Sequence, residues 1–533
     1  MAKTDSSKRK SRPPQAGLPF NGAVDTSKSR HLSLANEATR LLSAGQLEPA
    51  RKLYMEILNE NEEDVFALHG VALVARDMKR LPVAVELMKK ALSLDPRNPM
   101  IASNLGTIHE AMKNYEEALA CYKNAVKWGI RDGVIHNNIG SVLSKFGRRT
   151  EALIEFRKAL KYGVEFPEAM TNMATMLGDL GDYKQAGYYF RRALEIDPEN
   201  AHAHHNFGVV LLRQGEWETA WEHCEWRMVA TNRGVPWRKF PQPLWNGNPF
   251  QGARLILYAE QGIGDEIRHA SMIPEAIARG GEVVVECAPR LVSLFQRSFP
   301  QTRVVPAKYW PAEEGIEPFD IACPLGTLGR LFRNSKESFP MHSGYLKPDP
   351  RLVSMFRERL KEAGPGPYVG ICWRSGLAGA YRAEHYSTIE DMKPVMKVDG
   401  VTYVNLQYDA RSEELDTVKS EFGVDLVVWD DVDLKMELEK AAALTSCMDL
   451  VVSPGTSVAV MAGALGVETV EFRPFPIPDS YFKNGRCPWF PSVRFFAKRQ
   501  SEKWSKMFRK IAAEIEALKA VQSSDRSRLE ARR

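Results

Sequence analysis

One alanine recurs through the first half of the chain at a constant spacing. It stands at positions 50, 84, 118, 152, 186 and 220, so every interval is 34 residues. A small residue recurs twelve positions earlier, at Ala38, Ala72, Gly106, Gly140, Ala174 and Gly208. A large side chain follows the alanine by four positions in five units, Tyr54, Met88, Tyr122, Phe156 and Phe190, and the sixth has Cys224. A fixed period of this length predicts a stack of equivalent supersecondary units.

The small and large columns predict two antiparallel helices in each unit. Helices approach closely only where side chains are small, and the large residue then fills the space between them. Asp95-Pro96 and Asp197-Pro198 end two of the second helices, because proline cannot continue a helix. The pattern resembles the tetratricopeptide repeat over about residues 31–230. We therefore predict six repeats within residues 30–234, stacked as a superhelix with a concave face.

A column of asparagines accompanies the repeats. Its members are Asn36, Asn104, Asn138, Asn172 and Asn206, and the second unit has Gly70 there. The register predicts that they lie on the concave face, where each amide offers a donor and an acceptor to an extended polypeptide. The nucleocytoplasmic O-GlcNAc transferases carry a similar ladder that holds protein substrates. The alternative is that each amide only packs helices together. We predict binding of a protein acceptor.

The charge is concentrated at the start of the chain. Residues 1–30 carry seven Lys or Arg and two Asp, which accounts for the whole net charge of +5. The remainder is near neutral, so no nucleic-acid partner is expected. No run of about 20 apolar residues occurs, so no transmembrane segment is expected either. The seven cysteines form no CxxC pair, which favours reduced core thiols. We predict a disordered basic tail over 1–29 and a cytoplasmic location.

The segment after the repeats is rich in tryptophan and proline. Residues 235–253 form the predicted bridge between the repeats and the next domain. The tryptophans at 217, 221, 226, 237 and 245 are expected to join the end of the repeat stack to that domain.

From residue 254 the pattern changes to alternating strands and helices. Strands are predicted at 254–259, 282–288, 302–306 and 319–323, and again at 368–373, 401–406, 425–429, 449–453 and 467–472. Helices are predicted at 267–280, 349–363 and 501–520, among others. Two successive blocks of this kind predict two parallel, doubly wound sheets. The expected fold is thus an α-solenoid followed by an α/β half, with one lobe over 254–347, a second lobe with its closing helix over 348–520, and a disordered tail over 521–533.

Several motifs in this half resemble those of a glycosyltransferase family. They are FPQPLWNGNP (240–249), AEQGIGDEIRHA (259–270), VGICWRSG (369–376), VNLQYD (404–409), SPGTSVAVMAGALGV (453–467) and PWFPSVRFF (488–496). They are similar to bacterial repeat-linked glycosyltransferases of the GT-B fold whose catalytic half is heptosyltransferase-like. Some members of that group resemble flagellin glycosyltransferases. The resemblance implies an inverting, metal-independent enzyme that uses a nucleotide sugar as co-substrate and needs no cofactor.

The resemblance also assigns roles within GIGDE (262–266). Asp265 takes the position of the general base that deprotonates the acceptor hydroxyl, and His269 lies within reach. The alternative for Asp265 is a helix N-cap. Gly262 and Gly264 allow the backbone to approach a donor closely.

Further donor-binding residues are predicted in the second lobe. Arg374 and Arg382 are candidates for the donor diphosphate, because a guanidinium pairs bidentately with phosphate. The remaining candidates are Ser375, Gln407, Gly455, Thr456 and Ser457, with loop capping as the alternative for Gln407. Family members usually have an acidic residue and a histidine where this chain has Gly455 and Val460.

We therefore expect a transferase that moves a sugar from a nucleotide donor to Ser or Thr of a protein held by the repeats, with flagellin as one candidate acceptor. Two alternatives remain open. One is a non-catalytic repeat scaffold with a degenerate transferase half, and the other is a transferase acting on a glycan or lipid. No metal site is expected. Asp431 and Asp433 imitate a metal-binding DxD pair, and we interpret them as an acidic loop.

Overall fold

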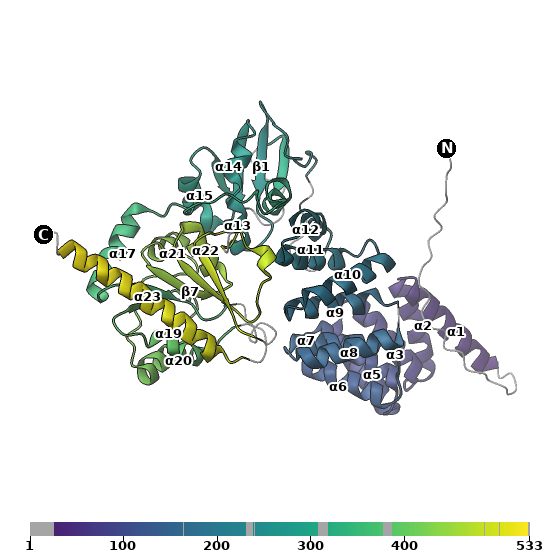
Figure 1. The fold of residues 1–533 in the computed structure, drawn as a ribbon. Helices are drawn as coiled ribbons and strands as arrows, with labels where there is room; N and C mark the ends of the chain where they lie inside the picture. The colour runs from purple at the N-terminus through teal and green to yellow at the C-terminus, as the bar shows by residue number, and fades with distance from the viewer. Residues whose placement is uncertain are drawn as a thin grey trace. The chain divides into compact units, whose positions relative to one another are not determined.

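The computed structural model describes residues 26–163, 165–230, 238, 240–307, 318–376, 386–483, 486–499 and 502–530. The chain divides into two compact units, one up to Ile130 and one from Arg131 onward. In the described residues, the first unit contains only helices and the second contains helices and two parallel sheets (Figure 1). Residues 26–29 begin helix α1 (Thr26–Ser43), so the disordered tail predicted over 1–29 is wrong for 26–29. Residues 1–25, Trp237 and Arg382 lie outside the described residues.

The first unit consists of helix pairs that follow the repeat pattern. They are α1 (Thr26–Ser43) with α2 (Leu47–Glu60), α3 (Val65–Asp77) with α4 (Leu81–Leu94), and α5 (Pro99–Ala111) with α6 (Tyr115–Lys127). Local sequence sets the ends of these helices. Asn98 caps α5 by accepting hydrogen bonds from the backbone N–H groups of Met100 and Ile101. Pro99 occupies the first turn, where its missing N–H is not needed.

The small and large columns of the repeats meet as predicted. Ala50, Ala84 and Ala118 are fully buried. A Cβ added at Gly106 would lie 2.6 Å from a ring carbon of Tyr122, so only glycine fits there without movement. The columns therefore mark the closest approach between helices.

The second unit begins with three more helix pairs of the same kind. They are α7 (Gly133–Lys145) with α8 (Arg149–Tyr162), α9 (Pro167–Asp179) with α10 (Tyr183–Ile196), and α11 (Ala201–Gln214) with α12 (Trp217–Cys224). A Cβ added at Gly140 would lie 2.6 Å from the ring of Phe156, and one at Gly208 would lie 2.7 Å from Sγ of Cys224. The packing rule of the first unit therefore holds here.

The first sheet is parallel, with strand order β3-β2-β1-β4. Its strands are β1 (Arg254–Tyr258), β2 (Glu282–Cys287), β3 (Arg303–Pro306) and β4 (Ile321–Pro324). The associated helices are α13 (Ile263–Ala270), α14 (Ile273–Ile277), α15 (Val292–Ser298) and α16 (Leu328–Phe332). The single helix predicted over 267–280 is wrong. It divides into α13 and α14, because Pro274 has no N–H to continue α13 and instead occupies the first turn of α14.

The second sheet is also parallel, with order β6-β5-β7-β8-β9. Its strands are β5 (Tyr368–Ile371), β6 (Thr402–Asn405), β7 (Leu450–Pro454), β8 (Thr469–Arg473) and β9 (Val493–Ala497). Its helices include α17 (Pro350–Ala363), α19 (Lys393–Met396), α20 (Ser412–Thr417), α21 (Leu438–Thr445), α22 (Ser457–Leu465) and α23 (Trp504–Glu530). The sequence did not predict β9.

The strand predicted at 425–429 is reduced to a single bridge. Val427 pairs with Val404 at the edge of the sheet, and its N–H and C=O bond to Tyr403 and Asn405, each at 2.9 Å. If that bridge is counted, the chain-order numbering across the sheet becomes 3-2-1-4-5-6, which is the order of the Rossmann fold. Both halves of the fold prediction are therefore confirmed: a tetratricopeptide solenoid is followed by an α/β region with two parallel sheets.

The last helix, α23, covers the second sheet. Phe508, Ile511 and Ile515 are buried there with Val369 and Val470. The helix continues to Glu530, so the disordered tail predicted over 521–533 is wrong for 521–530. Residues 531–533 lie outside the described part of the chain. No helix in the described part is long and apolar enough to cross a membrane.

Two tryptophans join the last repeats to the sheets, as predicted. The Trp217 ring centroid lies 4.7 Å from that of Phe339 and 5.4 Å from that of Tyr481. Trp221 donates from Nε1 to the carbonyl of Arg333 at 2.7 Å.

The other two described tryptophans of the predicted cluster lie elsewhere. Trp226 stacks on His204 within the last repeat, and Trp245 packs on Phe250 and Phe332 beside the first sheet. Of the four described tryptophans, only Trp217 and Trp221, both on α12, therefore join the last repeat to the sheet region.

Candidate active site

Two turns that are far apart in the sequence lie against each other in the second unit. Gly262 is the N-cap of α13, and Thr456 is the N-cap of α22. A Cβ added at Gly264 would lie 3.7 Å from Cα of Ser457 and 4.0 Å from Cγ2 of Val460. Because these turns follow β1 and β7, the carboxyl ends of both sheets meet here. Parallel α/β proteins bind ligands at such ends.

A cavity of about 370 Å³ lies beside the first of these turns. We call it the Asp265 cavity. Its wall combines residues of the last repeat with residues of both sheet regions, among them His205, Arg213, Asp265, His269, Arg473 and Trp489. The repeats and the α/β region thus share one cavity.

Asp265 lies in the first turn of α13 and faces this cavity. Its Oδ1 is 3.4 Å from Nη1 of Arg268, and its side chain is 40% exposed. The helix is capped by Gly262, so the N-cap alternative for Asp265 is wrong. A loosely paired carboxylate on a cavity wall is suited to accept a proton from a nearby hydroxyl.

His269 lies one helical turn after Asp265, on the same face of α13. It is buried, and its ring meets that of Trp489 edge to face at 6.0 Å. Burial, with the neighbouring charges of Arg268 and Arg227, lowers the pKa of His269 to about 3. The imidazole is therefore neutral near pH 7, and it is a weaker base than an ordinary histidine.

A second cavity, of about 320 Å³, lies at the carboxyl ends of β7 and β8. We call it the Gly455 cavity. Gly455, Glu471 and Arg473 line one side, and Asp179, Tyr183 and Arg213 of the repeats also line it. The repeats again form part of the wall.

The structure explains both departures from the resembled family. A Cβ added at Gly455 would lie 2.9 Å from Oε1 of Glu471, so an acidic side chain at 455 would displace that carboxylate. Glu471 thus already places a carboxylate beside position 455. Val460 is buried and packs against Gly264 of α13, so this position makes an apolar contact between the two sheet regions.

Arg213 and Arg473 line both cavities, and the sequence analysis missed them. Arg473 ends β8, and its Nη2 lies 2.6 Å from Oε1 of Glu471. Arg213 lies near the end of α11, and its Nη1 is 3.4 Å from the carbonyl of Gly178. The rule that ligands bind at strand ends would have found Arg473. Nothing in the repeat pattern distinguishes Arg213.

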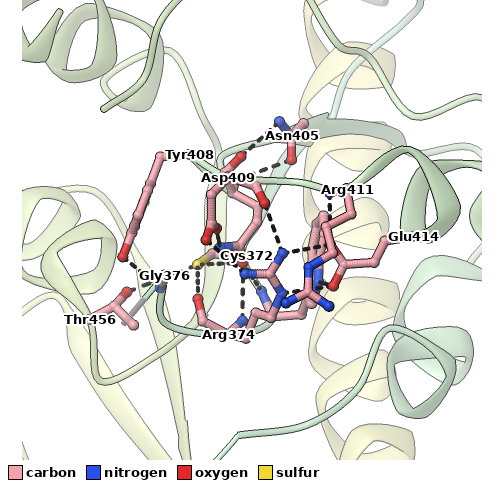
Figure 2. Close-up of polar contacts among 11 residues, drawn as sticks. Cys372, Arg374, Gly376, Asn405, Tyr408, Asp409, Arg411, Glu414 and Thr456 are labelled. Carbon is pink, nitrogen blue, oxygen red and sulfur yellow. Dashed lines mark hydrogen bonds and ion pairs between the residues drawn. The ribbon is translucent and has the colours of Figure 1, made fainter. Parts of the chain in front are cut away.

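Arg374, the predicted phosphate ligand, is held by carboxylates instead (Figure 2). Its Nε and Nη2 donate to Glu414 at 2.7 Å each, and its Nη1 donates to Oδ2 of Asp409 at 2.9 Å. Nη2 also donates to the carbonyl of Asp409. The guanidinium is largely buried, and these ion pairs raise its pKa. We correct its role: Arg374 fixes the loop after β5, because its charge is already matched by two carboxylates.

Gln407 has the capping role that was its alternative. Its Oε1 accepts hydrogen bonds from the N–H groups of Trp373 and Arg374, and its Nε2 donates to Asp409. The side chain is 1% exposed, so it has no free face for a nucleotide.

The other predicted donor residues have separate positions. Thr456 uses its hydroxyl to accept from the N–H of Val458 at the start of α22. Ser457 lies beside Gly264, and Ser375 directly follows Arg374 in the loop after β5. None of these three lines either of the two cavities described here. The prediction for Arg382 falls outside the described residues.

Three asparagines of the column make hydrogen bonds between repeats, which favours the alternative that these amides pack helices together. Nδ2 of Asn172 donates to Asn137 at 2.9 Å, and Nδ2 of Asn206 lies 3.1 Å from the Thr175 hydroxyl. In the first unit, Nδ2 of Asn104 lies 2.7 Å from Nε2 of His69. These bonds join neighbouring repeats and use one of the two N–H donors of each amide. Asn36 is exposed and Asn138 is partly exposed, and both stay candidates for binding a polypeptide.

Among the described residues, no group of three or more His, Cys, Asp or Glu side chains is arranged to hold a metal ion. Asp431 instead pairs bidentately with Arg359 at 2.7 and 2.8 Å, which lowers its pKa. Asp433 accepts hydrogen bonds from the N–H groups of Lys435 and Met436. The carboxylates of both acids are thus engaged by groups of the protein, one by α17 and one by its own loop.

Comparison with known proteins supports the repeats directly. Residues 174–215 match a family described as TPR repeat, and residues 102–128 match one described as tetratricopeptide repeat. Protein FlbA of Caulobacter vibrioides is 32% identical over 320 residues, which is 57% of this chain and 53% of FlbA. The chain therefore spans about half the length of that relative.

Solved repeat proteins resemble parts of the chain at low overall similarity. YrrB, described as a TPR protein with an unusual peptide-binding site, is 24% identical with a TM-score of 0.29 and covers 34% of this chain and 93% of its own. PilF of Pseudomonas aeruginosa is 20% identical with a TM-score of 0.36 and covers 39% of this chain and 95% of its own. Together with the matched repeat families, the helix pairs make this region a protein-interaction scaffold.

Proposed function

We propose that this protein transfers a sugar from a nucleotide-sugar donor to a hydroxyl of a protein acceptor, with flagellin as one candidate acceptor. One observation carries the proposal: the Asp265 cavity is lined by a protein-interaction repeat, by the carboxylate of Asp265, and by arginines. The resemblance to heptosyltransferase-like enzymes supports the same reaction. The location of such a reaction would be the cytoplasm, where nucleotide sugars are made.

The arrangement fits an inverting displacement. The acceptor hydroxyl loses its proton to Asp265 as its oxygen attacks the anomeric carbon of the sugar. The new bond to the acceptor oxygen forms as the bond from that carbon to the donor phosphate breaks. The nucleotide leaves with the bonding electrons, and Arg213 and Arg473 stabilise the charge that develops on its phosphate. No metal or cofactor is required by this scheme.

A non-catalytic scaffold is the second candidate, and two observations favour it. Arg374 is neutralised by Glu414 and Asp409, and Val460 packs as an apolar contact where the resembled enzymes have histidine. In this case the repeats would bind a partner protein, and no reaction would take place in the Asp265 cavity.

Replacing Asp265 tests the proposal. Cells lacking the gene are complemented with the natural protein, with Asp265→Asn, or with Glu218→Gln, and glycosylated proteins are compared by mass spectrometry. Glu218 is an exposed carboxylate of α12 outside the Asp265 cavity, so it is a matched control. We expect Asp265→Asn to reduce sugar occupancy by about 10²-fold or more, since a positioned base contributes about 10²–10⁴-fold.

The outcomes separate the candidates. Unchanged occupancy with Asp265→Asn would reject the base assignment. Identical protein glycosylation with and without the gene would favour the scaffold. A modified glycan or lipid with unmodified protein would show that the acceptor class is wrong.

A further inference from the structure

We propose that the repeats form one wall of the nucleotide pocket, and that Arg213 is a ligand for the donor diphosphate. This inference rests on the proposed function and extends it, because the repeats then bind the donor as well as the acceptor. The pocket in question is the Gly455 cavity, together with the two arginines it shares with the Asp265 cavity.

The Gly455 cavity contains the three kinds of side chain that a nucleoside diphosphate requires. Tyr183, Tyr386 and Phe475 offer aromatic surface to a base. Asp179 and Glu471 offer carboxylates, which bind ribose hydroxyls in other dinucleotide and nucleotide sites. Arg213 and Arg473 offer guanidinium groups to phosphate. A volume of about 320 Å³ is within the usual range for small-molecule pockets.

The two arginines are incompletely engaged, unlike Arg374. Among the described residues, the polar contacts of Arg213 are long, at 3.4 Å to the carbonyl of Gly178 and 3.9 Å to Oδ1 of Asp179. Arg473 is paired with Glu471 through Nη2, but its buried Nε has no hydrogen-bond partner among the described residues. Buried donors of this kind are costly unless a ligand or water satisfies them. Their shared position between the two cavities is where a diphosphate would link a nucleoside to the reacting sugar.

The two carboxylates of the Gly455 cavity, Asp179 and Glu471, do not remove its preference for a nucleoside diphosphate. Asp179 is partly buried, and one of its oxygens, Oδ2, is inaccessible to solvent and has no hydrogen-bond partner among the described residues. Burial raises its pKa, against the opposing charges of Arg213 and Arg149. An acid that is poorly solvated and unpaired on one side is a ready acceptor for a ribose hydroxyl. The pocket wall formed by α9, α10 and α11 therefore complements both the sugar and the phosphates of a nucleotide.

Binding by the full-length protein tests the inference. Isothermal titration calorimetry with UDP, GDP and inorganic pyrophosphate is carried out on the natural protein, Arg213→Ala, Arg213→Lys, Arg473→Ala and Arg192→Ala. Arg192 is an exposed repeat arginine that pairs with Glu195 and lies outside both cavities, so it is the control. Because a lost charged hydrogen bond changes affinity by about tenfold or more, we expect Arg213→Ala to weaken nucleoside diphosphate binding at least tenfold. Arg213→Lys should recover part of it, and Arg192→Ala should change nothing.

The opposite results would overturn the inference in distinct ways. Equal affinity of Arg213→Ala and the natural protein, with binding abolished by Arg473→Ala, would restrict the pocket to the α/β region. Binding of pyrophosphate as tight as that of UDP and GDP would remove the nucleoside part of the assignment. No binding of any of the three probes by the natural protein would reject the pocket. The result with Asp265→Asn in cells is independent, so loss of glycosylation there would leave the proposed function standing.

Discussion

The first three repeats and the last three follow one residue pattern, but their turns have different surroundings. Gly45, between α1 and α2, has φ +71°, and a Cβ there would meet nothing within 4 Å. Gly181 and Gly215 adopt the same left-handed conformation in the second unit. A Cβ on Gly181 would lie 3.4 Å from Phe475, and one on Gly215 would lie 2.6 Å from the carbonyl oxygen of Ser480. The repeat pattern thus specifies the helix pairs, while contacts outside the pattern make the last repeats part of the sheet-containing unit.

The largest contrast is expected from two buried aromatic residues. Trp221→Ala and Tyr54→Ala should each destabilise their own unit by about 3–5 kcal/mol, because each removes a fully packed ring. Trp221→Ala should reduce hydrogen-exchange protection in both α12 and β1, since Trp221 belongs to the same buried core as Leu255 and Leu257 of β1. Tyr54→Ala should reduce protection only within the first unit. Equal loss of protection in β1 for both variants would contradict the division between the two sets of repeats.

A smaller contrast is expected at the turn glycines. Gly45→Ala should cost about 1 kcal/mol, because alanine disfavours a positive φ. Gly215→Ala should cost about 1–3 kcal/mol more, because the new methyl group meets the Ser480 carbonyl. Urea denaturation of both variants measures the difference. The same cost at both positions would mean that the turn of the last repeat is not packed as described.

The pH dependence should separate the two units through their buried histidines. Burial lowers the pKa of His69 to about 4 and that of His269 to about 3. The unfolded chain therefore binds more protons below about pH 6.5, so stability falls as the pH is lowered from there toward these values. Replacing either histidine by Gln removes its titration. As the pH is lowered, each variant should therefore lose less stability than the natural protein, with a difference of up to about 1.4 kcal/mol per pH unit.

The unit affected should differ between the two histidine variants. His69→Gln should flatten the pH response of the first unit only, and His269→Gln that of the second only. Differential scanning calorimetry between pH 7 and pH 5 provides the measurement. Unchanged pH slopes in both variants would mean that the two histidines are not held neutral by burial.

The smallest effects are expected in the asparagine column. Asn172→Ala should cost about 0.5–1.5 kcal/mol, because Nδ2 of Asn172 bonds to the preceding repeat. Asn36→Ala should be nearly neutral for stability, since Asn36 is exposed. If the column holds a polypeptide, combined replacement of Asn36 and Asn138 should instead lower acceptor modification. Unaltered modification in that double variant would leave only the packing role.

The sequence predicts the repeats well because each column has one geometric meaning. Each helix pair needs glycine or alanine opposite a large side chain, as Gly106 lies opposite Tyr122. This requirement is local to the pair and does not depend on the position of the repeat in the chain. The parallel strands are also predictable, since apolar runs such as LILY and LVVS are buried on both faces. The run around Val427 shows the limit of this prediction. It has the composition of a strand, but only Val427 pairs with the edge of the sheet.

The site is less predictable, because whether a side chain is free to bind a ligand depends on partners that are distant in the sequence. Arg374 stands in the recognised motif, yet Glu414 and Asp409, 35 to 40 positions away, take its hydrogen-bonding capacity. Arg213 belongs to a repeat helix and carries no motif, yet folding brings it to the cavities of the α/β region. Sequence located the turns at Asp265 and Gly455, and folding determined which cations accompany them.

The central claim is that the last repeats and the α/β region share one donor site. Hydrogen exchange of the full-length protein with and without saturating UDP or GDP tests it most directly. We predict added protection in two places at once, the 453–457 turn and the neighbouring parts of α9 and α11, with no change in α1 to α4. Protection confined to the α/β region, with α9 and α11 unchanged, would contradict the claim.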